Sequence, residues 1–150
     1  MGTAYRVAEQ TTAALEAQDF GAVRAQLAND FVFDDPTTPA PAMNAEEWLA
    51  ASQGLSQAFP DFTYNFEIVR EEGNQVWVSS QWEGTHQGDW DLSIMGLGVI
   101  RATGRRVSTG RSMTRGTVNA KGKIQRTEVV EGGADAGLPA ILQQLGVEVG

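Results

Sequence analysis

The sequence predicts an α+β domain in which three helices precede a run of antiparallel strands. Apolar residues recur at helical spacing up to residue 59, and after Pro60 they alternate with polar residues. Helices followed by strands are typical of α+β folds, in which the sheet curls over the helices. Because 150 residues suffice for one hydrophobic core, we expect a single domain over residues 1–150. A curved sheet of this kind encloses a cavity, which is the default ligand site.

The helices are predicted within the first 59 residues. Residues 3–18 place apolar side chains at helical spacing and are rich in alanine. Residues 18–28 predict a short helix that Asp19 caps at its N-terminus. Residues 44–59 predict a third helix, with Asn44 as its N-cap and glutamates in the first turn.

The strands are predicted around and after these helices. Residues 30–36, DFVFDDP, predict a short strand that Asp35-Pro36 closes, because the residue before a proline is biased away from helical backbone. Further strands are predicted at residues 62–73, 75–86, 105–118 and 124–131. The link GGADAG then leads to a terminal segment at residues 138–149.

The composition excludes several kinds of site. The chain has no cysteine and one histidine, which rules out disulfides, a thiol nucleophile and a multi-histidine zinc site. No calcium-loop pattern is present, so we expect no metal, although carboxylates alone could hold one. No apolar run approaches the roughly 20 residues that span a bilayer, and MGTAYRVAEQ has no features of a secretion signal. We therefore expect a cytoplasmic protein without a membrane segment.

The charge is unevenly distributed along the chain. Residues 1–100 carry 3 basic and 15 acidic side chains, whereas residues 101–150 carry 8 and 4. The net charge of −8 argues against nucleic-acid binding, which depends on neutralising phosphates. The basic stretch from Arg101 to Arg126 is either a solvated sheet face, a subunit contact or a local anion site.

The motifs AFPDF, GTHQG, ATGRRV, GKI and LQQLG occur in this order between residues 58 and 146. In order and spacing they resemble the SnoaL-like polyketide cyclase family, and the resemblance extends over nearly the whole chain. It implies a cone-shaped NTF2-like fold, and either an enzyme that uses a carboxylate as acid and base without a cofactor or an unassigned relative. Ketosteroid isomerase and limonene-type epoxide hydrolase share this fold, so the fold alone does not define the reaction.

Asp35 is the first candidate catalytic residue. It lies in FDDP, which resembles the Asp-Pro of ketosteroid isomerase, where the aspartate shuttles a proton. Next to Phe33 and Trp48, its carboxylate could act as a base. The alternative is that Asp34 and Asp35 simply end a strand or accept hydrogen bonds from loop amides.

Glu128 is the second candidate. It falls near the position of the catalytic aspartate of the polyketide cyclases, although the family's His-x-Asp pattern is Arg126-Thr127-Glu128 in this chain. One β-bulge would turn Glu131 inward instead. Otherwise Glu128 is a surface residue paired with Arg126 or Lys123.

His86, in GTHQG, is the third candidate. The alternation over residues 75–86 puts it on the face of Val78 and Trp82, which we expect to point inward. There an imidazole could relay a proton or donate to an enolate, or it could merely tie down the next loop. Residues 91–100 are interpreted as an apolar lip over the cavity mouth, or as a subunit contact.

The predicted substrate-binding residues are Trp48, Trp82, Met95 and Thr114. Flat apolar walls suit an aromatic, polycyclic or isoprenoid ligand, although tryptophans more often pack in cores. Thr114 and Thr11 align with the two strong donors of the oxyanion hole of ketosteroid isomerase, so steroid isomerisation is not expected.

The leading hypothesis is an aldol cyclase or isomerase that acts on a small apolar carbonyl compound without a cofactor. Asp35 or Glu128 would remove a proton, and His86 would stabilise the enolate, in a homodimer or homotetramer. One alternative is a non-catalytic binding protein with the same cavity, and another is an interaction module with a basic partner. A perturbed carboxylate pKa in the cavity would favour the enzyme.

Overall fold

The computed structural model describes residues 2–36, 42–93, 96–132 and 137–146. The helices in these ranges are α1 (Thr3–Glu16), α2 (Phe20–Ala25), α3 (Ala45–Ala58) and α4 (Gly137–Gln144). The predicted caps are confirmed, because the carboxylate of Asp19 accepts the Ala22 N–H at 3.2 Å and the side chain of Asn44 accepts the Glu47 N–H at 2.9 Å. None of the helices in the described ranges is long and apolar enough to cross a membrane.

The strands form one large sheet and two small ones. The six-stranded sheet has the order β2-β1-β10-β9-β4-β3, and the small sheets pair β5 with β8 and β6 with β7. The strands of the large sheet are β1 (Leu27–Asp34), β2 (Met43–Asn44), β3 (Glu67–Glu72), β4 (Gln75–Ser80), β9 (Ser112–Val118) and β10 (Ile124–Gly132). The shorter ones are β5 (Glu83–Thr85), β6 (Trp90–Asp91), β7 (Val99–Ile100) and β8 (Arg106–Ser108). The prediction of an α+β fold is therefore confirmed.

Two of the predicted strands are broken where the sheet bends. The strand expected over residues 75–86 divides into β4 and β5, and the strand expected over residues 105–118 divides into β8 and β9. At the break the Trp82 N–H donates to Thr109 Oγ1 at 3.0 Å, and the Thr109 N–H donates to the Trp82 carbonyl at 2.8 Å. These two hydrogen bonds join the two interruptions, so both segments of the chain bend at the same place.

The strand expected over residues 62–73 starts later than predicted, at Glu67. Asn65 has a φ of +48°, which interrupts the extended backbone just before the strand. Thr63 forms only an isolated bridge with Glu83. This irregular segment nevertheless carries Tyr64 and Phe66 toward the interior.

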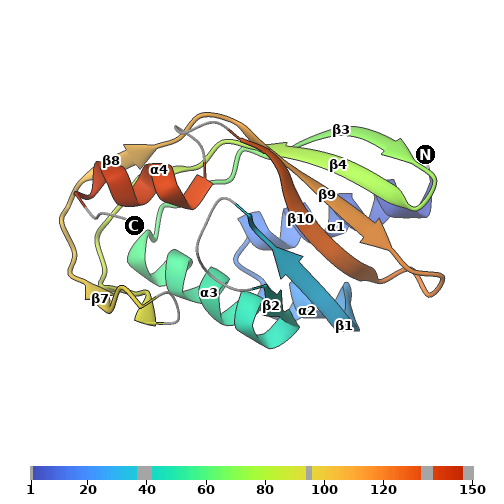
Figure 1. The fold of residues 1–150 in the computed structure, drawn as a ribbon, viewed down its shortest axis with the longest axis horizontal. Helices are drawn as coiled ribbons and strands as arrows, with labels where there is room; N and C mark the ends of the chain where they lie inside the picture. The colour runs from blue at the N-terminus through green and yellow to red at the C-terminus, as the bar shows by residue number, and fades with distance from the viewer. Residues whose placement is uncertain (1, 37–41, 94–95, 133–136, 147–150) are drawn as a thin grey trace.

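The helices α1, α2 and α3 lie on one side of the curved large sheet, and α4 lies beside β8 at one end of the molecule (Figure 1). The largest fully buried side chains are Phe31, Phe59, Ile141, Leu142, His86, Val23 and Val107. The hydrophobic core includes Phe59 at the end of α3 and Ile141 and Leu142 of α4.

Candidate functional site

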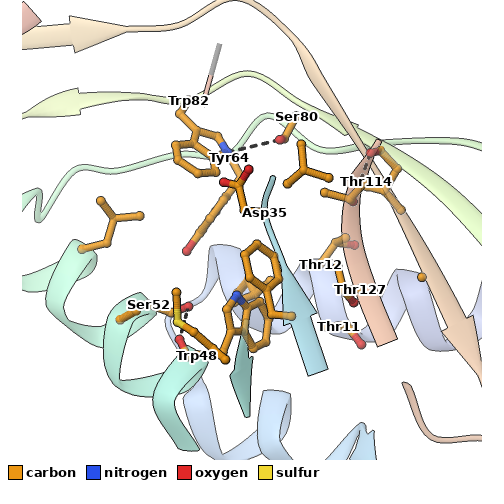
Figure 2. Close-up of a pocket in the computed structure, with 18 of the residues that line it drawn as sticks. Thr11, Thr12, Asp35, Trp48, Ser52, Tyr64, Ser80, Trp82, Thr114 and Thr127 are labelled. Atoms are coloured by element: carbon orange, nitrogen blue, oxygen red, sulfur yellow. Dashed lines mark hydrogen bonds between the residues drawn. The ribbon is translucent and has the colours of Figure 1, made fainter. Parts of the chain in front are cut away.

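A cavity of about 640 Å³ lies between the large sheet and helices α1 and α3. Most of its lining is apolar, with Val7 and Leu15 from α1, Leu55 from α3, and Val76 and Val78 from β4. Its size falls in the range of sites for small molecules. The cavity is therefore the place where a ligand can be enclosed (Figure 2).

Aromatic side chains form two walls of this cavity. On one side, Trp48 of α3 stacks on Phe33 of β1, with ring centroids 5.7 Å apart. On the other side, Tyr64 stacks on Phe66 at 4.8 Å and meets Trp82 edge to face at 6.3 Å. Trp48 and Trp82 thus line the cavity as expected, and they also pack against the core.

Asp35 follows directly after β1 and lines the cavity, next to the Phe33–Trp48 stack. Its neighbour Asp34 points to the opposite face of the sheet, where its carboxylate accepts a hydrogen bond from Arg126 Nη2 at 3.2 Å. Successive side chains of a strand alternate between faces, so the two adjacent aspartates occupy different environments.

Glu47 and Asp91 also bring carboxylates to the cavity, and both form local hydrogen bonds. Glu47 accepts the Asn44 N–H at 3.0 Å in the capping box of α3. Asp91 accepts both the N–H and the hydroxyl of Ser93, at 3.0 and 2.5 Å. These bonds tie Glu47 and Asp91 to their own segments.

No lysine, arginine or histidine belongs to the described lining of the cavity. Its charged groups are the carboxylates of Asp35, Glu47 and Asp91. Burying an anion beside carboxylates, with no cation to pair it, is strongly unfavourable. The mostly apolar lining therefore disfavours an anionic ligand.

The structure places Glu128 outside the cavity, contrary to the expectation from the sequence. Its neighbours Thr127 and Val129 point inward, whereas the Glu128 carboxylate pairs with Arg115 and, at 3.7 Å, with Arg126 Nε. The hydrogen bond from Arg115 holds the pKa of the Glu128 carboxyl below its usual value.

Glu131, the alternative on the same strand, also stays outside. β10 has a bulge between Val129 and Glu131, as considered from the sequence, but the Glu131 side chain is exposed and does not line the cavity. The inward face of β10 therefore carries hydroxyl and apolar groups and no carboxylate in its described part.

The structure also corrects the position expected for His86. The residue is fully buried, but it lies outside the cavity lining and stacks on Phe59 at 5.1 Å. Its Nδ1 accepts the Thr103 N–H at 3.2 Å, and Nε2 has no hydrogen-bond partner in the part of the chain that the structure describes. The predicted alternation fails here because the strand breaks at Trp82, which changes the face on which later residues lie.

The contacts of His86 fit the alternative in which it ties down the following loop. Its backbone N–H donates to the Arg105 carbonyl at 2.8 Å, and its carbonyl accepts the Gly104 N–H at 2.8 Å. Burial lowers the pKa of the imidazole, and the nearby Asp89 carboxylate opposes this shift in part. A neutral His86 thus anchors the loop around residue 103.

The hydroxyl groups of the lining differ in how they are used. Thr11 donates to the Val7 carbonyl at 2.7 Å, and Thr114 donates to the Val78 carbonyl at 3.3 Å. Thr114 therefore lines the cavity as predicted, with its hydroxyl bound to backbone. Met95, the remaining predicted binding residue, lies outside the described residues.

Tyr64 and Ser80 are polar lining residues that the sequence analysis did not select. Ser80 Oγ accepts the indole N–H of Trp82 at 3.1 Å (Figure 2). Tyr64 and Phe66 are two residues apart in the predicted strand, so the alternation indicates that both rings point inward. The pattern does not indicate whether the hydroxyl of Tyr64 reaches a cavity or packs in the core.

Comparison with protein families gave a match for this chain. The model of the SnoaL-like domain matches residues 8–127. A search against curated proteins gave no significant match. The matched range contains both aromatic walls and Asp35.

Solved structures with low sequence identity share the fold. AclR of Streptomyces galilaeus, a candidate hydroxylase, is 21% identical with a TM-score of 0.72, and the match covers 95% of each chain. IdmH of Streptomyces antibioticus, a candidate polyketide cyclase, is 22% identical with a TM-score of 0.69 over 96% of this chain and 99% of its own. An NTF2-like protein of Burkholderia thailandensis is 19% identical with a TM-score of 0.72 over 99% and 100%.

These likenesses show the NTF2-like fold, and their different descriptions agree with the rule that one fold hosts several reactions. The family match extends over most of the chain and includes the walls of the cavity. The chain therefore belongs to the SnoaL-like family and has the NTF2-like fold.

Proposed function

We propose that this protein is an acid–base enzyme that acts without a cofactor on a small, uncharged carbonyl compound, with Asp35 as the base. The observation that carries the proposal is a carboxylate at the wall of a mostly apolar cavity, beside the Phe33–Trp48 stack. The cavity shields a bound carbonyl compound from bulk water, so a carbanion formed there is less readily protonated by solvent. The lining also disfavours an anionic substrate, as described above.

In the proposed step, the Asp35 carboxylate removes a proton from the carbon next to the carbonyl of the substrate. The electrons of the C–H bond move into the carbonyl group and form an enolate. In an aldol cyclisation the enolate carbon attacks a second carbonyl carbon, whose oxygen becomes an alkoxide and takes the proton from the Asp35 carboxylic acid. In an isomerisation the enolate takes this proton back at another carbon. A positioned general base of this kind accelerates a reaction by about 10²–10⁴-fold.

Deuterium exchange tests the proposal without knowledge of the natural substrate. 2-Tetralone is a flat, uncharged ketone with acidic hydrogens beside its carbonyl, and NMR in D₂O follows their loss. We expect the protein to accelerate this exchange and Asp35→Asn to reduce the acceleration by about 100-fold or more.

Asp34→Asn is the matched control, because Asp34 is the adjacent carboxylate and faces away from the cavity toward Arg126. This variant should retain the exchange rate of the unmodified protein. Equal exchange in Asp35→Asn and the unmodified protein would show that Asp35 is not the base.

A non-catalytic binding protein is the second candidate, and the hydroxyl groups of Thr11 and Thr114 favour it. Thr11 donates to a backbone carbonyl of its own helix and Thr114 to one of the neighbouring strand β4, so neither offers a strong donor to a developing enolate. If 2-tetralone binds in the cavity but exchanges no faster than in buffer, this second function replaces the first.

The homodimer or homotetramer stays a prediction, as does a basic protein partner. Sedimentation velocity of the purified protein distinguishes the monomer of 16.1 kDa from either oligomer.

A further inference from the structure

We propose that the phenolic hydroxyl of Tyr64 binds the oxygen atom of the ligand and thereby selects molecules that carry a hydrogen-bond acceptor. The inference rests on the proposed function for the identity of that acceptor as a carbonyl oxygen. It concerns a residue on the irregular segment before β3, opposite the wall formed by Trp48 and Phe33.

Contacts on three sides hold the ring of Tyr64 in place. It stacks on Phe66 with an angle of 9° between the ring planes, meets Phe62 edge to face at 4.8 Å, and meets Trp82 edge to face at 6.3 Å. Figure 2 shows the ring reaching from the sheet side of the cavity toward Trp48 and Ser52, with the hydroxyl at its tip. The rigid ring therefore presents its hydroxyl to the enclosed space.

The backbone of Tyr64 is equally well fixed. Its N–H donates to the carboxylate of Glu16 in α1 at 2.6 Å, and its carbonyl accepts the Gln81 N–H at 2.8 Å. These bonds join the segment to α1 and to the bend of the sheet. Such support lets a donor meet a ligand without reorganising.

The hydroxyl of Tyr64 has no hydrogen-bond partner among the described residues, unlike those of Thr11, Ser52 and Thr114, which donate to backbone carbonyls. Ser112 and Thr127 also bring aliphatic hydroxyls to the cavity, but a phenol is a stronger donor. Burial, assisted by the negative charge of Glu16, raises the pKa of Tyr64. The group is thus a neutral donor throughout the physiological pH range.

A donor in an apolar cavity has consequences for selectivity. A ligand with an oxygen acceptor satisfies the hydroxyl, whereas a hydrocarbon of the same shape leaves it without a partner and away from water. We expect the cavity to prefer flat ketones over hydrocarbons of equal size, with Tyr64 responsible for the difference.

The test compares 2-acetonaphthone, a flat ketone, with 2-ethylnaphthalene, which has the same ring system but no oxygen. We expect Tyr64→Phe to weaken binding of the ketone by about two- to tenfold and to strengthen binding of the hydrocarbon slightly, because no hydroxyl is then left without a partner. Tyr5→Phe is the matched control, because Tyr5 is the other tyrosine of the chain and does not line the cavity.

A spectroscopic measurement reports the hydrogen bond directly. The ¹³C resonance of a labelled carbonyl should move downfield when the ketone binds the unmodified protein or Tyr5→Phe, and should not do so in Tyr64→Phe. An unchanged resonance and unchanged ketone affinity in a folded Tyr64→Phe variant overturn the inference, as does a lack of binding by the unmodified protein.

The two proposals fail in different ways. Loss of exchange in Asp35→Asn, with no effect of Tyr64→Phe on binding or on the carbonyl resonance, overturns the role of Tyr64 alone. A clear effect of Tyr64→Phe on binding, with no deuterium exchange by the unmodified protein, supports the role of Tyr64 and overturns the enzymatic function.

Discussion

Adjacent carboxylates in this protein have different surroundings because strand geometry alternates their directions. Asp34 meets Arg126 on the outer face of the sheet, whereas Asp35 lies at the cavity wall. The same alternation separates Glu128 from Thr127 on β10. A single step along the backbone thus decides whether a carboxylate is part of an ion pair or part of the candidate site.

Glu128 should contribute to stability and not to deuterium exchange. We expect Glu128→Gln to lower the free energy of unfolding by about 0.5–1 kcal/mol at pH 7, because it removes a partly buried pair with Arg115. The pKa of Glu128 is lowered from 4.5 in the folded protein, so its contribution is present above pH 4.5 and is lost as the pH falls through the lowered pKa.

Urea denaturation of both proteins at several pH values checks this expectation. The stability difference between Glu128→Gln and the unmodified protein should shrink at acidic pH. A large loss of exchange activity in a folded Glu128→Gln variant would mean that the carboxylate acts in the reaction after all.

The sequence was sufficient to predict which residues reach the cavity where the local pattern is regular. Trp48 follows from helical spacing, whereas Asp35 was indicated by the resemblance of FDDP to the Asp-Pro of ketosteroid isomerase. Glu128 could not be placed because a one-residue change of register reverses the face, and neither the local pattern nor a family position fixes that register. The role proposed for Tyr64 depends on three rings that come together only in the fold.

At the scale of elements, the bend at Trp82 and Thr109 explains most differences between expectation and structure. Two continuous alternating patterns in the sequence become four strands, because bonds between residues 27 positions apart hold both breaks. Local periodicity carries no information about such a contact. An unbroken strand over residues 75–86 would put His86 on the inward face. His86 follows the break, so this prediction is wrong.

Because His86 is buried, we expect the stability of the protein to depend on pH. The pKa of the buried imidazole is below 6.5, so the unfolded chain takes up a proton at a higher pH than the folded protein does. Stability is therefore highest above pH 6.5 and falls as the pH drops toward the folded pKa, by at most about 1.4 kcal/mol per pH unit.

Denaturation midpoints between pH 7.5 and 5.5 test this prediction cleanly, because His86 is the only histidine of the chain. The unmodified protein should become less stable over this range, and His86→Gln should show little change. An equal pH dependence in both proteins would assign the effect to other groups.

At the scale of the whole molecule, the acidic character of the chain extends into its cavity. The described lining contains carboxylates and no basic side chain, in a protein with a net charge of −8. We expect 2-naphthoate, an anion at pH 7, to bind at least about tenfold more weakly than 2-acetonaphthone, since its carboxylate would be buried without a partner.

Isothermal titration with both ligands measures this difference. Raising the salt concentration should not remove it, because screening acts mainly on exposed charges. Equal affinity for the two ligands would place the binding site elsewhere, for instance near the basic residues on the outer face of the sheet.

In the large sheet, β1 lies beside β10, a strand from the last part of the chain. β1 pairs in parallel with β10, so Val32 lies opposite Arg126 and Asp34 lies opposite Glu128. During synthesis, the strand that leads to Asp35 leaves the ribosome long before this neighbour exists. The inner wall formed by Thr127 and Val129 is therefore completed late, and pairing of such distant segments slows folding. A nascent chain that stops before residue 124 has the candidate base but lacks the wall that β10 provides.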